Sequence, residues 1–199
     1  MAYSHFTLPE IEQKLGITNQ EQHLFSDDIA PLSPSSWLVD TLQKAAHLPI
    51  RTEKARSEAI VFPILTELCE KNQHRITFYS GENLQADKKQ ALTGECDFIV
   101  SKNTGKYDLN IPIFALVEAK KNDFDEGIPQ CAAQMIGARI YNRKLKQELN
   151  TVYGCVTTAE QWLFLKLENN TVFIDKQKYS IKDLDVLLGV LQFIIRQFE

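Results

Sequence analysis

Several features that define common classes of protein are missing from this sequence. Its four cysteines (Cys69, Cys96, Cys131 and Cys155) stand far apart and form no CxxC pair, which argues against a disulfide framework or a zinc site. We therefore expect reduced thiols in a reducing compartment. The four histidines are scattered, and there is neither a G-x-S-x-G motif nor a complete P-loop. These absences argue against zinc proteins, hydrolases with a nucleophile elbow and P-loop nucleotide-binding proteins.

Long hydrophobic runs are also missing. The most apolar segment, 186–195, contains Gln192 and is far shorter than a membrane span of about 20 residues. The first residues, Met-Ala-Tyr-Ser-His-Phe, contain no basic region followed by an apolar stretch, so we predict no signal peptide. Hydrophobic residues make up 44% and charged residues 24% of the 199, which is typical of a globular domain. We expect a soluble, cytoplasmic protein.

The negative charge is concentrated near the N-terminus. The formal net charge is −4, and residues 1–35 account for all of it, because they contain Lys14 and five acidic residues. The rest of the chain is neutral overall, so no large basic field indicates nucleic-acid binding, although an anionic partner is not excluded. We predict an N-terminal helical arm over residues 1–50, packed on a core formed by residues 51–199.

Hydrophobic periodicity and turn residues predict one α/β or α+β domain. The expected helices are 8–15, 37–47, 52–71, 128–149 and 180–197. The expected strands are 75–80, 96–101, 111–119, 151–158, 162–168 and 171–175. Residues 81–94 are expected to form a polar loop, and Pro63 is expected to bend its helix near Ala59.

Three acidic residues and one lysine stand out from this pattern. Glu118 and Lys120 lie two apart, so they share one face at the end of an otherwise apolar strand. Asp97 interrupts the strand Cys-Asp-Phe-Ile-Val, where the structural alternative is a cap at the strand end. Glu58 lies on a helix face with Phe62, where the alternative is a boundary residue that reaches water or pairs with a lysine.

Together these residues are suited to bind a divalent cation. Mg²⁺ prefers hard oxygen ligands, usually one or two carboxylates with water and substrate phosphate, and Asp97 and Glu118 at neighbouring strand ends provide two. Lys120 is placed to orient a water molecule or to neutralise charge on the phosphorus. Glu58 is a candidate for an outer-shell contact or a second ion. The next helix supplies Gln130, and Gln134 on the same face, whose alternative is a solvated face.

These residues resemble the PD-(D/E)XK nuclease superfamily, and the nearest likeness is to small stand-alone members of unassigned role. The resemblance implies a restriction-endonuclease-like core, α-β-β-β-α-β, over residues 52–158 and a nuclease domain over residues 51–199. It makes Asp97 and Glu118 metal ligands and Lys120 the catalytic lysine, with Glu58 and Gln130 in auxiliary positions. The sequence departs from the family in having Cys96 where the family name has proline, and in lacking an evident basic extension.

Local positive charge provides candidate contacts to nucleic acid. These candidates are Gln134, Arg139, Arg143, Lys144 and Lys121. Such phosphate contacts would position a backbone without reading its sequence. The alternative is an ordinary solvated face with its counter-charges.

The leading hypothesis is a nuclease that depends on Mg²⁺, for which Mn²⁺ can substitute, and that hydrolyses phosphodiester bonds of nucleic acid, with DNA favoured over RNA. The rival is a non-catalytic nucleic-acid-binding or assembly module that retains the fold. The apolar final helix, with more apolar positions than one buried face needs, raises the expectation of a homodimer through this helix. A third reading is a soluble domain with an accidental acidic cluster.

Overall fold

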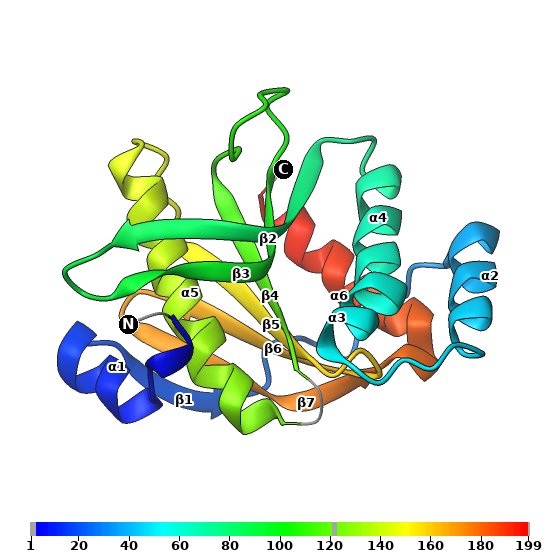
Figure 1. The fold of residues 1–199 in the computed structure, drawn as a ribbon, viewed down its shortest axis with the longest axis horizontal. Helices are drawn as coiled ribbons and strands as arrows, with labels where there is room; N and C mark the ends of the chain where they lie inside the picture. Colours follow the sequence, from blue (N-terminus) through cyan, green and yellow to red (C-terminus); the bar gives the residue numbers. More distant parts are fainter. Residues whose placement is uncertain (1–2, 121–122, 199) are drawn as a thin grey trace.

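The computed structural model describes residues 3–120 and 123–198, and it is an α/β protein with a mixed sheet flanked by helices (Figure 1). Seven strands form one sheet in the order β1-β7-β6-β5-β4-β3-β2. Their bounds are β1 Thr18–Gln22, β2 Ile76–Asp87, β3 Leu92–Lys102, β4 Ile113–Ala119, β5 Thr151–Thr157, β6 Gln161–Glu168 and β7 Thr171–Ser180. The pairs β1–β7 and β4–β5 are parallel, whereas the other four pairs are antiparallel.

Helices cover both faces of this sheet. They are α1 Leu8–Leu15, α2 Ser36–Ala45, α3 Glu53–Arg56, α4 Phe62–Lys71, α5 Phe124–Lys144 and α6 Leu184–Arg196. One apolar core lies between the sheet and α5, and a second core lies between the opposite face and α4 and α6. Helix α5 connects β4 to β5. Because these two strands are parallel, their C-terminal ends lie at the same end of the sheet. The first half of β3 also lies at this end of the sheet, because β3 runs antiparallel to β4.

The expected polar loop at 81–94 is wrong, because these residues form most of a long β-hairpin. β2 and β3 pair from Ile76–Lys102 to Asp87–Leu92. Leu84, Ala86 and Leu92 are buried in the core beside α5. The hydrophilic residues between them face solvent, so the hairpin buries one face only.

The first 50 residues pack on the core as expected, but they are not only helical. β1 is an edge strand that pairs in parallel with β7, from Thr18–Thr171 to Gln22–Asp175. The prediction of helices alone therefore missed one strand of the sheet. The hydroxyl of Tyr3 also donates a hydrogen bond to the carbonyl of Leu84 at 3.0 Å, which ties the start of the chain to the β2–β3 hairpin.

The segment that follows β1 covers part of α6. Leu32 donates its backbone N–H to the carbonyl of Asp185 at 2.9 Å, and Phe25 makes an edge-to-face contact with Phe193. Burial within one chain therefore accounts for the extra apolar positions Leu187, Val190 and Ile194 of α6, whereas Val186 and Phe193 remain exposed. The predicted homodimer stays a prediction, without support from this helix.

The helical segment expected over 52–71 is present, and its irregularity lies where Pro63 predicts it. α3 and α4 are joined by a π-helical turn, Ser57–Val61, in which the N–H of Phe62 bonds to the carbonyl of Ser57. Pro63 has no N–H to donate to Ala59, so the wider turn accommodates the missing hydrogen bond. The extra residue in this turn changes which side chains share a face with α4.

Other boundaries differ from the prediction by a few residues. α5 begins at Phe124 rather than 128 and ends at Lys144 rather than 149, and β7 continues to Ser180. Asp123 caps the helix by accepting the N–H of Asp125 at 2.8 Å. A helix therefore starts within a few residues of Lys120, with its first turns beside the ends of β4 and β5.

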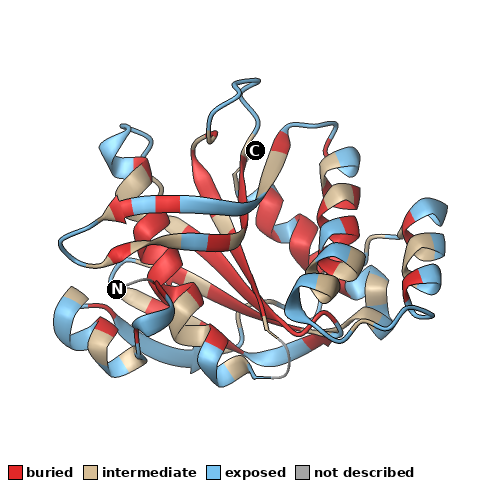
Figure 2. Ribbon diagram, viewed as in Figure 1, coloured by how far each residue is buried: buried red, intermediate tan, exposed pale blue. Residues whose placement is uncertain are grey.

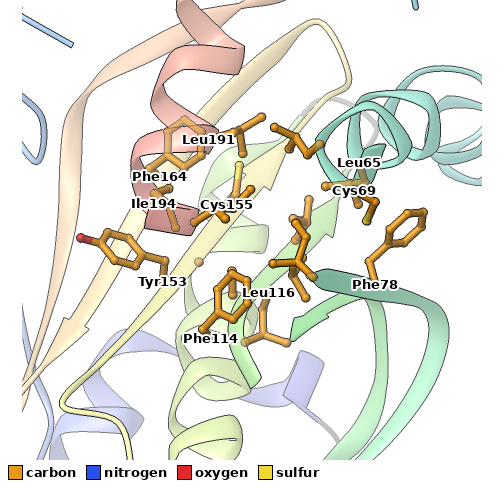
Figure 3. Close-up of a pocket in the computed structure, with 17 residues that line it drawn as sticks. Leu65, Cys69, Phe78, Phe114, Leu116, Tyr153, Cys155, Phe164, Leu191 and Ile194 are labelled. Carbon is orange, nitrogen blue, oxygen red and sulfur yellow. The ribbon is translucent and has the colours of Figure 1, made fainter. Parts of the chain in front are cut away.

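Buried residues lie on the strands of the sheet and on the helix faces that pack against it (Figure 2). A small cavity of about 30 Å³ lies between the sheet and the helices α4 and α6. Figure 3 shows Leu65 and Cys69 of α4 and Ile194 of α6 among the side chains that line it. Such a small apolar cavity is a packing space rather than a ligand site. No helix within the described part of the chain has the length and apolar character needed to cross a bilayer.

Candidate functional site

Asp97 and Glu118 lie close together at the end of the sheet where β4 terminates. The antiparallel register of β3 and β4 pairs Phe98 with Val117, so Asp97 and Glu118 stand one position beyond this pair. The Asp97 carboxylate accepts a hydrogen bond from the backbone N–H of Ala119 at 2.7 Å through Oδ2. Asp97 is therefore fixed against the end of β4 by the residue that separates Glu118 from Lys120.

The Glu118 carboxylate is buried and holds two side chains. Its exposed fraction is 2%. Oε2 accepts a hydrogen bond from Nε2 of Gln134 at 2.7 Å, and Oε1 lies 3.0 Å from the Lys120 ammonium. Gln134 thus belongs to the cluster through direct contact with an acid, and the alternative of a solvated helix face does not hold for it.

Lys120 is held from two directions. Its ammonium donates a hydrogen bond to Oε1 of Gln130 at 3.0 Å, and its backbone N–H bonds to the carbonyl of Thr157 at 2.8 Å. The first contact comes from the second turn of α5, and the other comes from the end of β5. The structure therefore brings together five of the predicted residues, which we call the acidic cluster: Asp97, Glu118, Lys120, Gln130 and Gln134.

The acidic cluster carries more negative charge than its position favours. Burial raises the pKa of Glu118 to about 7, and the nearby Asp97 carboxylate acts in the same direction. Burial also raises the pKa of Asp97, although the Ala119 N–H and Lys120 oppose this shift. For Lys120, burial lowers the pKa, but the Glu118 carboxylate outweighs it and the net shift is upward. Two carboxylates therefore share one ammonium in a partly dry environment.

Glu53 is a further acid near the cluster, on a short helix where no pattern in the sequence distinguishes it. Its carboxylate raises the pKa of both Asp97 and Lys120, so it lies within electrostatic reach of these two residues. Glu58 lies elsewhere on the same helical segment, with 66% of its side chain exposed and Oε1 3.8 Å from Nζ of Lys54. This is the structural alternative given for Glu58, a boundary residue paired with a lysine. Its auxiliary role stays a prediction.

The predicted basic contacts lie farther along α5. Arg139 donates to the carbonyl of Asn169, Arg143 pairs with Glu148 at 2.9 Å, and the Lys144 ammonium donates to the carbonyl of Ala86 at 2.5 Å. These three residues are one to three helical turns beyond Gln134, toward the other end of the strands. Each has an intramolecular partner, so the structure does not group them with the acidic cluster. Lys121 lies outside the described residues.

The cluster fits a hard divalent cation by its chemistry. Among the described residues, no group of three or more His, Cys, Asp and Glu side chains is arranged to hold a metal ion. Two carboxylates are nevertheless a common protein contribution to a Mg²⁺ site, where water and substrate phosphate complete the coordination. Oε1 of Gln134, in the side chain that contacts Glu118, is also buried and has no hydrogen-bond partner among residues 3–120 and 123–198. An oxygen-only set with one unsatisfied acceptor suits a hydrated cation.

The cysteines do not contribute ligands. All four are free thiols, and three of them (Cys96, Cys131 and Cys155) are buried. Burial raises the pKa of all three well above the ordinary thiol value. Because the thiolate is the metal ligand and the nucleophile, these side chains are suited to packing and not to chemistry.

The sequence was compared with protein-family models and with curated proteins, and neither comparison finds a match.

Proposed function

We propose that this protein is a metal-dependent nuclease that hydrolyses phosphodiester bonds of nucleic acid, DNA rather than RNA. The proposal includes a restriction-endonuclease-like core built from α4, the strands β2, β3 and β4, the helix α5 and the strand β5. Three antiparallel strands, a crossover helix and a parallel strand support this assignment. The acidic residues at the shared edge of β3 and β4 support the chemistry.

Each residue of the acidic cluster has a role in this proposal. Asp97 and Glu118 would hold Mg²⁺, or Mn²⁺ in its place. A bound ion of this kind polarises the phosphate and lowers the pKa of a bound water. Lys120 neutralises charge near the reacting phosphate, and Gln130 fixes the position of its ammonium. Gln134 orients the Glu118 carboxylate from the side of α5.

One observation carries the proposal: Glu118 is buried at 2% exposure beside a second carboxylate and an ammonium 3.0 Å away. Burying a carboxylate beside another carboxylate destabilises a fold unless a cation or a proton compensates. Functional sites are where such arrangements are concentrated. We also assign to Glu53 the supporting helix carboxylate that the family resemblance gave to Glu58, because Glu53 acts on Asp97 and Lys120.

Cleavage assays test the proposal directly. Purified protein with Mg²⁺ or Mn²⁺ is given plasmid DNA, single-stranded DNA and RNA in parallel. We expect cleavage of DNA that EDTA abolishes, and a loss of at least about 100-fold in Asp97→Ala and in Lys120→Ala with little change in thermal stability. Glu168→Gln, which alters a half-buried ion pair with Lys166 at the other end of β6, is the matched control and should retain full activity. Activity that survives both site variants would reject the assignment.

Two further arms separate the remaining alternatives. Glu53→Gln should lower the rate more than Glu58→Gln, and the reverse order would return the auxiliary role to Glu58. A non-catalytic binding module would show no cleavage, and calorimetric titration would show no Mg²⁺ binding that depends on Asp97.

A further inference from the structure

A groove lies at the same end of the sheet as the acidic cluster. Its volume is about 500 Å³. It is formed by the C-terminal part of α2 with the loop after it, and by α3 with the π-helical turn. The segment around the start of β6 and the segment around the end of β7 complete it. This volume falls within the range of sites that bind small ligands. We call it the α3 groove, and it shares no lining residue with the apolar cavity of the core.

The α3 groove and the acidic cluster flank the end of β5. Arg56, which lines the groove, donates a hydrogen bond from Nη1 to the carbonyl of Thr158 at 2.7 Å. The preceding carbonyl, that of Thr157, accepts the backbone N–H of Lys120 at 2.8 Å. Glu53 and Arg56 are the two ends of α3, so this single turn presents a carboxylate toward the cluster and a guanidinium toward the groove.

Arg56 has a positive charge that the described residues do not neutralise. Its guanidinium makes one hydrogen bond, to a carbonyl, and Nε is buried without a partner in the described chain. No carboxylate lies within ion-pair distance of Arg56 among the described residues. A guanidinium favours planar, bidentate contact with phosphate or carboxylate oxygens, so a bound anion would provide the missing acceptors.

Part of the groove lining is apolar. Leu48 is 59% exposed, and Ile50, Ile60 and Ile181, which also line the groove, are half-buried. These side chains provide apolar surface against which a ring can pack. Lys182 and Glu160 also line the groove, so it offers both positive charge and a hydrogen-bond acceptor.

We propose that the α3 groove binds one unpaired nucleotide of the nucleic-acid substrate. Arg56 binds its phosphate, and the base lies against Leu48, Ile50 and Ile60. The carboxylate of Glu160 suits hydrogen-bond donors of a base, such as the N3–H of thymine, and disfavours a second phosphate. A base within a duplex is stacked and cannot enter such a groove, so the occupant comes from a single-stranded region or a strand end. This inference rests on the proposed function, and it specifies the substrate class as single-stranded or locally unpaired DNA.

Binding measured without catalysis tests the inference. A fluorescein-labelled single-stranded dT12 oligonucleotide and a labelled 12-base-pair duplex are titrated with protein in EDTA at low salt, and anisotropy is recorded. We expect the wild type to bind dT12 at least about tenfold more tightly than the duplex. Arg56→Gln should weaken dT12 binding about tenfold, because it removes a charged hydrogen bond to phosphate. Arg51→Gln removes the same charge from an exposed position outside the groove and should change binding less than threefold.

Leu48→Ser is the second variant, because its side chain is largely exposed and the core does not depend on it. It should weaken dT12 binding severalfold with an unchanged melting temperature. Wild-type affinity in both Arg56→Gln and Leu48→Ser would overturn the inference, as would equal binding of duplex and single strand. Asp97→Ala separates the two proposals, because it should lose cleavage and keep dT12 binding. Asp97-dependent cleavage with no effect of the groove variants would leave the nuclease and remove the groove.

Discussion

Gln134 donates a hydrogen bond to Oε2 of Glu118 at 2.7 Å, while the other oxygen of the same carboxylate faces Lys120 at 3.0 Å. Gln134 lies on α5, which starts at the end of the sheet where β4 terminates, and Lys120 directly follows β4. A buried carboxylate held in this way responds to protons and to cations more strongly than a solvated one. The first two predictions test that response.

Glu118 should make the folded state less stable as the pH rises from about 5 to 8. Its pKa is raised from 4.5 to about 7, so between these values the folded state binds more protons than the unfolded state and stability falls with increasing pH. Glu118→Gln removes this dependence. Urea denaturation should show the variant equal to the wild type near pH 4 and more stable by about 3 kcal/mol at pH 8. A variant less stable at pH 8 would mean that the contact with Lys120 outweighs the burial of charge.

Mg²⁺ should stabilise the protein, and more at pH 8 than at pH 5, because the cation competes with the proton on Glu118. At a concentration about 100-fold above the dissociation constant the gain is about 2.7 kcal/mol. Differential scanning calorimetry with and without EDTA measures it. Asp97→Asn should abolish the gain, whereas Glu148→Gln, which changes an exposed residue in the loop after α5, should preserve it.

Glu67 should be a strong determinant of stability away from the site. It is 3% exposed and accepts hydrogen bonds from the backbone N–H and the hydroxyl of Ser35, at 2.7 and 2.6 Å. Glu67→Ala leaves the N–H at the start of α2 without its acceptor, and we expect a loss of about 2–4 kcal/mol by urea denaturation. Glu148→Ala breaks an exposed ion pair with Arg143 and should cost no more than about 0.5 kcal/mol. Similar losses in the two variants would contradict this assignment.

Gly189→Ala should destabilise the protein, although alanine is the better helix former by about 1 kcal/mol. A Cβ at this position in α6 would lie 2.6 Å from the carbonyl oxygen of Ala30, which is backbone and cannot move alone. We expect a lower melting temperature and faster proteolysis between residues 24 and 32. Val186→Ala, at an exposed position on the same helix, should be nearly neutral. An unchanged or raised melting temperature in Gly189→Ala would show that this segment is not held closely.

The sequence predicts most of the acidic cluster because strand ends have a clear signal. Glu118 and Lys120 follow an apolar run, and Asp97 breaks another, so their convergence follows from the pairing of the strands. Gln130 follows because a helix must start soon after Lys120. The fold class and six of the seven strands among the described residues, β2 to β7, follow from the same periodicity.

Features that depend on tertiary contacts escape the sequence. β1 reads Thr-Asn-Gln-Glu-Gln, without one apolar residue, and becomes a strand only because β7 offers a free edge. The hairpin at 81–94 is mostly hydrophilic and is fixed by a few buried side chains such as Leu84. Helical periodicity placed Glu58 on an apolar face with Phe62, but both residues are largely exposed, and a π-helical turn interrupts the helix between them.

The pairing of β1 with β7 also has a consequence for the biosynthesis of the protein. Thr18 is paired with Thr171, so the edge of the sheet cannot close until most of the chain has been translated. Contacts between residues so distant in sequence form slowly, since the intervening loop must be ordered first. Until β7 has been synthesised, β1 has no partner strand. Its hydrophilic composition disfavours pairing of this unpaired strand with strands of other nascent chains.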